Sequence, residues 1–330
     1  RRLTSVVCHS LSDVPDIIDT WNEGKVVDIE GYYENAKINR VYVDRVHVKK
    51  AFAEYTAAYN ADDPKIKLKI DHTYRVAALC ERIAKAAGMC AYDVELAWLS
   101  GMLHDVGRFE QIKRYNTFSD ADSVDHAKFG ADLLFKDGLI STFLNGMVKC
   151  TGYKPGALED RYSSDGVFLY DRLNKSDMEM LELAIRCHNM YRIPQGLNRR
   201  EQAFCNVLRD ADKVDIFKVN IDAPLEEIYN TTTEELMKSD ITDEVLKAFD
   251  EEHCILKAIR RTPADTVIGH VSLAYELVYD ESVRITVEQG YLAKLMHFHS
   301  DNEETNRKMA MVREKMDSYV KKRIGRKMHR

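Results

Sequence analysis

The stretch Leu99-Ser-Gly-Met-Leu-His-Asp-Val-Gly-Arg108 sets a His-Asp pair at the end of a strongly apolar helical pattern. The residues before the pair are apolar on most sides of the predicted helix, which is typical of a helix at the centre of a molecule. We expect this helix to end near Gly107. With 11 His and 30 Asp in 330 residues, about one His-Asp pair is expected by chance. The pair is therefore informative only because it follows an apolar helical pattern. An imidazole and a carboxylate placed in or beside a core must be paired or must bind something.

Two further polar residues lie on core-type helical patterns on either side of this stretch. His72 shares a helix face with Val76 and Leu79, in a pattern that predicts a helix over residues 65–87. Asp212 lies in the string Val-Leu-Arg-Asp-Ala-Asp-Lys-Val-Asp-Ile-Phe, again among core-type residues. Two imidazoles and two carboxylates from three helices suit a borderline divalent ion such as Mn, Fe, Ni or Co.

The composition favours a mostly helical, cytoplasmic protein. Apolar residues make up 45% of the chain, and 15 Gly and 6 Pro are too few for a protein of many short strands. The net charge of −6 argues against a general polyanion binder. Seven Cys without a CxxC pair indicate reduced thiols in a cytosolic protein. No apolar run reaches the roughly 18–20 residues of a membrane span, and no secretory signal is visible.

The order His72, His104-Asp105, Asp212 on successive helices resembles the H…HD…D signature of the HD-domain metal-dependent phosphohydrolases. The strings Leu-His-Asp-Val-Gly-Arg-Phe-Glu and Asp-Ala-Asp-Lys-Val-Asp are particularly like those of the family's bacterial members. The resemblance covers residues 65–220 and implies an all-α HD-domain helical bundle with additional C-terminal helices. It implies a hydrolase that acts on phosphate ester bonds with one or two divalent ions (Mn, Fe, Ni, Co or Mg). The implied ligands of the first ion are His72, His104, Asp105 and Asp212.

The resemblance extends to a second ion. His126 and His188 occupy positions like those that ligate a second metal in dinuclear members, and the alternative for each is a hydrogen-bonded core or surface histidine. For the first ion, the family's final aspartate follows Ala, which selects Asp212. Asp210 lies about 200° away from it around a helix, whereas Asp215 shares its side. We interpret Asp210 and Asp215 as supporting or salt-bridge groups.

Cations are needed near the metals to bind a substrate phosphate. Arg75 and Arg108 follow predicted ligands at the helical spacings i+3 and i+4, so both are expected near the site. Lys128 lies two residues after another predicted ligand. We therefore predict Arg75, Arg108 and Lys128, together with Asp105, as the catalytic residues. The alternative for each cation is a solvated surface side chain.

The substrate is narrowed only to a small phosphate ester, with nucleotides among the candidates. Val-Gly-Arg follows the His-Asp pair where stringent-response hydrolases carry Glu-Asp, which disfavours ppGpp, and the strings typical of cyclic-di-GMP hydrolases are incomplete. The alternative from another class is a metal-binding regulatory or scaffold protein of the same fold without turnover. No membrane partner is expected, nucleic acid is a weak third alternative, and homo-oligomerisation is left open.

Three segments are predicted. Residues 1–45 form an N-terminal extension without a clear pattern, and residues 46–222 form the HD-type metal-binding helical domain. Residues 223–330 form a C-terminal helical extension that packs on it, with a capping box at Thr232 and Glu235. The final 24 residues hold ten Lys or Arg and two acidic residues. We expect this basic terminal helix to dock on an acidic surface of its own chain or of a second copy.

Overall fold

The computed structural model describes residues 43–144, 149–150, 168–169, 175–229 and 231–325. Within them the chain is mostly helical, and two short strands, β1 (Lys149–Cys150) and β2 (Phe168–Leu169), pair in antiparallel fashion. The predicted all-α fold class is therefore confirmed. Residues 1–42, which make up most of the predicted N-terminal extension, lie outside the described residues.

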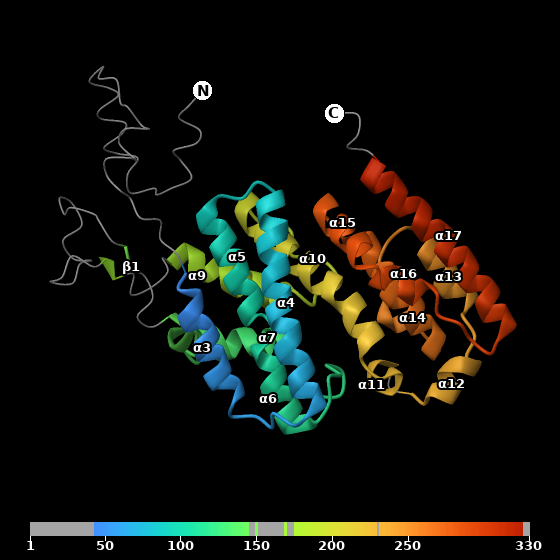
Figure 1. Ribbon diagram of the computed structural model, residues 1–330, viewed down its shortest axis with the longest axis horizontal. Helices are drawn as coiled ribbons and strands as arrows, with labels where there is room; N and C mark the ends of the chain where they lie inside the picture. The colour runs from blue at the N-terminus through green and yellow to red at the C-terminus, as the bar shows by residue number, and fades with distance from the viewer. Residues whose placement is uncertain (1–42, 145–148, 151–167, 170–174, 230, 326–330) are drawn as a thin grey trace, which may run out of the picture.

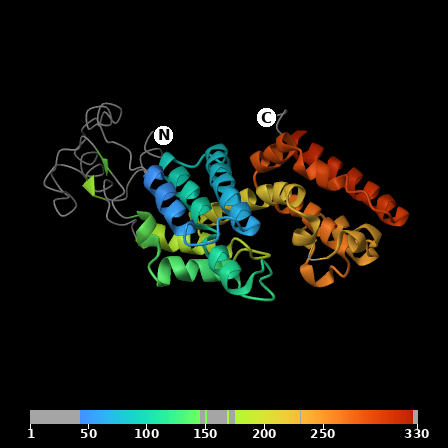
Figure 2. The same ribbon diagram turned by 60° about the horizontal axis from the view of Figure 1, so that its bottom comes forward.

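The helices form two groups that are joined by the long helix α10 (Figure 1, Figure 2). The first group contains α3 Arg45–Thr56, α4 Pro64–Ala86, α5 Ala91–Leu103, α6 Val106–Tyr115, α7 His126–Ala131 with the π-helical turn Asp132–Lys136, α8 Ile140–Leu144, α9 Lys175–Cys187 and α10 Arg199–Asp222. The second group contains α11 Leu225–Tyr229, α12 Thr233–Lys238, α13 Asp243–Asp250, the 3-10 turn Lys257–Ile259, α14 Pro263–Val271, the 3-10 turn Ser272–Glu276, α15 Asp280–Gln289, α16 Tyr291–Met296 and α17 Glu303–Gly325. Among the described helices, none combines the length and the apolar composition that a membrane crossing needs.

The two longest helices of the first group, α4 and α10, begin at well-defined capping residues. Asp63 accepts a hydrogen bond of 2.8 Å from the backbone N–H of Lys65, and Pro64 stands at the first helical position, where its missing N–H costs nothing. Helix α10 begins with a capping box formed by Asn198 and Glu201. These ends set the register of both helices, and both helices carry predicted metal ligands.

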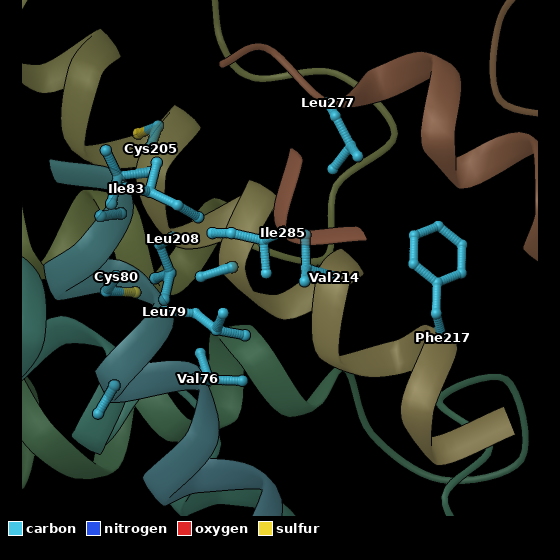
Figure 3. Packing of buried hydrophobic residues seen from close by; sticks show 14 of the residues in the cluster. Val76, Leu79, Cys80, Ile83, Cys205, Leu208, Val214, Phe217, Leu277 and Ile285 are labelled. Carbon is cyan, nitrogen blue, oxygen red and sulfur yellow. The ribbon is translucent and has the colours of Figure 1, made fainter. Parts of the chain in front are cut away.

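The apolar faces of α4 and α10 meet each other and the second group of helices. Figure 3 shows Val76, Leu79 and Ile83 of α4 beside Leu208 of α10, with Ile285 of α15 nearby. All five side chains are buried. Burial of a large aliphatic side chain contributes about 1.5–3 kcal/mol, so this cluster holds α4 and α10 firmly side by side.

Two glycines allow close helix contacts around the His-Asp pair. A Cβ atom at Gly101 would lie 2.6 Å from the Cα of Ala77, so α5 touches the backbone of α4. A Cβ atom at Gly107 would lie 2.5 Å from the carbonyl oxygen of His126, so α6 touches the start of α7. Any larger residue at either position would push apart the helices that carry the predicted ligands.

The prediction that the apolar helix ends near Gly107 is wrong. Helix α5 ends at Leu103 and α6 begins at Val106, so His104 and Asp105 form the turn between them. Gly107 lies inside α6, where its missing side chain serves close packing rather than helix termination. This turn lets two adjacent residues present their side chains to the same site.

Asp210 joins the second group of helices to α10. Its carboxylate accepts hydrogen bonds from the backbone N–H groups of Val278 (3.0 Å) and Tyr279 (2.9 Å) and from the hydroxyl of Ser282 (2.7 Å). These donors lie at the start of α15, where a helix N-terminus favours negative charge. Asp210 therefore supports the start of α15 instead of a metal site.

The basic helix α17 packs on the second group of helices. The buried apolar side of α17 consists of Met309, Val312 and Met316. On its polar side, Lys315 pairs with Asp250, and Arg323 pairs with Asp280 at 3.2 Å. Through this apolar side and these ion pairs α17, which ends at Gly325, packs on its own chain, and the prediction that the surface beneath it is acidic stays a prediction. The predicted division at residue 222 stays a prediction.

Candidate metal centre

Five separate segments of the first group of helices bring the six predicted ligands together. His72 comes from α4, the His-Asp pair from the turn between α5 and α6, and Asp212 from α10. The remaining two histidines come from the first residue of α7 and the residue that follows α9. Five of the six residues are buried, and the Asp212 side chain is 15% exposed. The structure thus places all six predicted residues in one mostly buried cluster.

The first half of this centre contains His72, His104 and Asp212, and we call it the first cluster. The Nε2 atom of His72 lies 3.3 Å from Nε2 of His104 and 3.1 Å from Oδ1 of Asp212. The Oδ2 atom of Asp105 lies 3.5 Å from Nε2 of His72 and 3.4 Å from Nε2 of His104. The ligand atoms of His72, His104 and Asp212 all lie within 4.8 Å of one another, a spacing that can hold a metal ion.

The second half contains His126 and His188, and we call it the second cluster. Their Nε2 atoms lie 3.1 Å apart. The other carboxylate oxygen of Asp105, Oδ1, lies 3.6 Å from Nε2 of His126 and 3.8 Å from Nε2 of His188. Asp105 therefore stands between the clusters and turns one oxygen toward each, which is the arrangement of a carboxylate that can bridge two ions.

All four histidines direct Nε2 into the centre because Nδ1 is already used. The Nδ1 atoms contact oxygen acceptors as follows: His72 with Asp215 (2.6 Å), His104 with the Gly101 carbonyl (2.7 Å), His126 with Asp120 (2.7 Å) and His188 with the Ile185 carbonyl (2.6 Å). A carbonyl or carboxylate oxygen only accepts, so each Nδ1 carries the hydrogen. A neutral ring with this tautomer leaves a lone pair on Nε2 that is available to a metal ion.

The electrostatics favour neutral imidazoles in the second cluster and an ionised carboxylate beside them. Burial and the neighbouring His126 lower the pKa of His188 to about 3. Burial and Arg108 also lower the pKa of His126. Burial alone would raise the pKa of Asp105, but Lys69 and the adjacent imidazoles hold it well below its usual range. Two facing lone pairs 3.1 Å apart repel each other unless a cation lies between them, so the donor set fits a divalent ion.

The first cluster differs because His72 is flanked by two carboxylates. Burial and Lys69 act to lower the pKa of His72, but hydrogen bonds with Asp212 and Asp215 raise it above the ordinary value. A proton on this ring would occupy the side of Nε2 that a metal ion needs. A metal ion that binds the first cluster would therefore displace this proton.

The three predicted phosphate-binding cations lie in different surroundings. Arg75 forms a bidentate pair with Asp215, with distances of 2.6 and 2.9 Å. Lys128 is 54% exposed and pairs with Asp125 at 2.8 Å. Arg108 lies deeper, and its Nε is 3.8 Å from the Oδ1 atom of Asp105. All three pair with a carboxylate, Arg108 with Asp120 at 2.9 Å, but only Arg108 also lies this close to the carboxylate of a predicted ligand.

Three residues at the site were missed in the sequence. The Nζ atom of Lys69 lies 2.7 Å from Oδ2 of Asp105, and the spacing i−3 from His72 was the available signal. Asp120 binds His126 from a loop, where no periodic pattern marks it. The ring of Phe118 lies 5.5 Å from the Lys69 ammonium, so it borders the same region.

Residues 70–220 match the family model of the HD domain, and this segment contains all six clustered residues. This segment is therefore an HD domain, as the sequence motifs predicted. HD domains bind divalent metals, and the family consists generally of hydrolases. No curated protein and no solved structure matches the chain.

Proposed function

We propose that this protein is a metal-dependent phosphohydrolase that acts on a nucleotide or another small phosphate ester. The observation that carries the proposal is the pair of Nε2 atoms of His126 and His188, which face each other at 3.1 Å while both Nδ1 hydrogens are donated elsewhere. Asp105 supports it, because its two oxygens face the two clusters.

The proposed ligands follow from this geometry. His72, His104 and Asp212 hold one ion, His126 and His188 hold the other, and Asp105 contributes to both. A donor set this rich in imidazole favours Mn, Fe, Ni or Co over Mg, which prefers oxygen ligands. Ions held there would polarise the phosphoryl group and lower the pKa of a bound water molecule.

The proposed contacts to substrate come from cations beside Asp105. Lys69 is 14% exposed and Arg108 is 13% exposed, so both lie at the edge of the buried cluster, where their charge is effective. Arg75 and Lys128 remain in the proposal only on condition that they exchange their carboxylate partners for a phosphate. Phe118 lies within reach of both Lys69 and Arg108 and gives the substrate's organic group an apolar surface.

The test is a screen of nucleotides, sugar phosphates and aryl phosphate esters with the full-length chain and added Mn²⁺. We expect metal-dependent release of phosphate or of a nucleotide product, abolished by a chelator and restored by Mn²⁺. Tight metal binding without turnover of any ester would instead favour a regulatory or scaffold protein of the same fold. Absence of metal binding would contradict both functions.

A further inference from the structure

The histidines of the metal centre use two kinds of acceptor for their Nδ1 hydrogens. In each cluster one histidine donates to a main-chain carbonyl three residues earlier, and the other donates to a carboxylate. The carboxylate-backed histidines are His72 and His126. A charged acceptor forms a stronger hydrogen bond than a carbonyl and increases the basicity of the opposite ring nitrogen.

The first of these histidines belongs to a chain of three residues that we call the His72 relay. His72 donates to Asp215 at 2.6 Å, and Asp215 accepts both Nε–H (2.6 Å) and Nη2–H (2.9 Å) from Arg75. Asp215 is 1% exposed. The bidentate guanidinium compensates the buried charge and fixes the plane of the carboxylate, which in turn orients the imidazole.

The second histidine belongs to an equivalent chain, the His126 relay. His126 donates to Asp120 at 2.7 Å, and Arg108 donates Nη1–H to the same carboxylate at 2.9 Å. Gln111 adds a further hydrogen bond of 3.0 Å to Asp120. Asp120 is 27% exposed, and it comes from the loop between α6 and α7 rather than from a helix.

The alternative is that both Asp–Arg pairs stabilise the fold and nothing more. The chain contains a pair of that kind for comparison, Asp177 with Arg200 at 2.7 Å. Asp177 is also buried, and it accepts a hydrogen bond from the hydroxyl of Tyr92 rather than from an imidazole. In both relays the carboxylate is shared between an arginine and a histidine whose other nitrogen faces the metal centre.

We propose that each relay sets the divalent-ion affinity of its own cluster, so that Asp215 controls the first cluster and Asp120 controls the second. This inference rests on the proposed metal centre. It assigns Asp215 and Asp120 as positioning residues, and it gives Arg75 and Arg108 a task in holding these carboxylates. The two ion sites are then adjustable one at a time, although they share Asp105.

The experiment isolates one cluster at a time in the full-length chain. His188→Ala removes the second cluster and keeps the first, and His104→Ala does the reverse. In the metal-free His188→Ala protein, titration calorimetry with Mn²⁺ should show that Asp215→Asn raises Kd roughly 10- to 100-fold. Asp120→Asn should leave the Kd of that protein unchanged. In the His104→Ala protein, Asp120→Asn should raise Kd to the same extent and Asp215→Asn should leave it unchanged.

Asp177→Asn is the matched control, because it alters a buried Asp–Arg pair in which the carboxylate accepts from a tyrosine hydroxyl. We expect it to lower the melting temperature of the metal-free protein without changing either Kd. Equal weakening by Asp215→Asn and Asp120→Asn in one background would overturn the assignment of one relay to one cluster. If Asp215→Asn and Asp120→Asn leave the Mn²⁺ affinity unchanged in both backgrounds, the relay inference is overturned. The proposed metal centre would remain intact. If Asp215→Asn does not fold, the inference is tested by Asp120→Asn alone, in the His104→Ala protein. Asp120 is the more exposed of the two carboxylates, so its substitution is less disruptive.

A wild-type protein that binds no Mn²⁺ is a separate result. It would overturn the proposed centre before any variant is made, and the relay inference with it. The titration of the wild type therefore comes first. The relay inference requires that the wild type binds two Mn²⁺ ions. It also requires that each Asp→Asn substitution weakens only the cluster assigned to it.

Discussion

The two clusters of the metal centre share Asp105 but stand on different scaffolds. The first cluster takes two of its three residues from α4 and α10, helices of 23 and 24 residues whose N-termini are capped, and His104 from the turn between α5 and α6. The second takes His188 from the end of α9 and His126 from α7, which has 6 residues and is supported by the loop that carries Asp120. Long helices packed through a common core open only with much of the fold, whereas a short helix and a loop open locally. Of the two proposed ion sites, the first is therefore expected to be the more rigid and the second the more adjustable.

The largest effect is expected from breaking the first cluster. Asp212→Ala removes a proposed ligand on α10, and His104→Ala removes one from the turn between α5 and α6. In either variant the ion at this cluster should be lost and hydrolysis should fall to background. Metal analysis and activity assays measure the result, and circular dichroism checks that the helices persist. Wild-type metal content in either variant would contradict the ligand assignment.

The second cluster should respond more locally. His126→Ala or His188→Ala removes one of the two facing Nε2 atoms, so the number of bound ions should fall from near two to near one per chain. Because α7 and its loop lie beside the main α4–α10 core, the melting temperature of the metal-free protein should change little. Loss of both ions from either variant would show that the clusters are not separable.

A smaller effect is expected from the cations beside Asp105. A charge-assisted contact to phosphate contributes about 1.5–3 kcal/mol, so Lys69→Ala should lower kcat/KM by about one to two orders of magnitude at unchanged metal content. Arg108→Ala, measured at saturating Mn²⁺, should do the same. Lys67→Ala is the matched control, because Lys67 is an exposed lysine of the same helix. Full efficiency in Lys69→Ala would show that this ammonium does not reach the substrate.

The smallest effect is expected outside the metal centre, in the second group of helices. Thr232 accepts a hydrogen bond of 3.1 Å from the backbone N–H of Glu235, and the Glu235 carboxylate accepts one from the backbone N–H of Thr232, which confirms the predicted capping box. Thr232→Ala should lower the free energy of unfolding by about 1 kcal/mol. Denaturant unfolding measures this, and both Mn²⁺ affinities should stay at wild-type values. A change in either affinity would mean that the second group of helices acts on the metal centre.

The helical fold and the HD domain could be predicted from the sequence because both depend on local patterns. His72 and Asp212 lie on periodic apolar faces, which is why they could be recognised before the structure was known. Gly107 was misinterpreted because a glycine that ends a helix and one that admits a neighbouring helix look alike in sequence. Asp120 was missed because the partner that explains it is reached through a loop without periodicity.

The side chains that bind the arginines could not be predicted from the sequence either. Helical spacing placed Arg75 within one turn of His72, and the structure agrees with that spacing. Spacing along one helix, however, says nothing about side chains on another helix. In the structure the Arg75 guanidinium binds the carboxylate of Asp215 on α10. The sequence thus predicted which residues approach the metal centre but could not predict what each one binds there.

The most direct test of the account is the number of divalent ions that the wild-type chain binds. Metal-free, full-length protein titrated with Mn²⁺ should bind two ions per chain, because Asp105 turns one oxygen toward each cluster and both clusters present Nε2 lone pairs. Binding that saturates at one ion would contradict the two-cluster centre, and no binding would contradict the metal centre altogether.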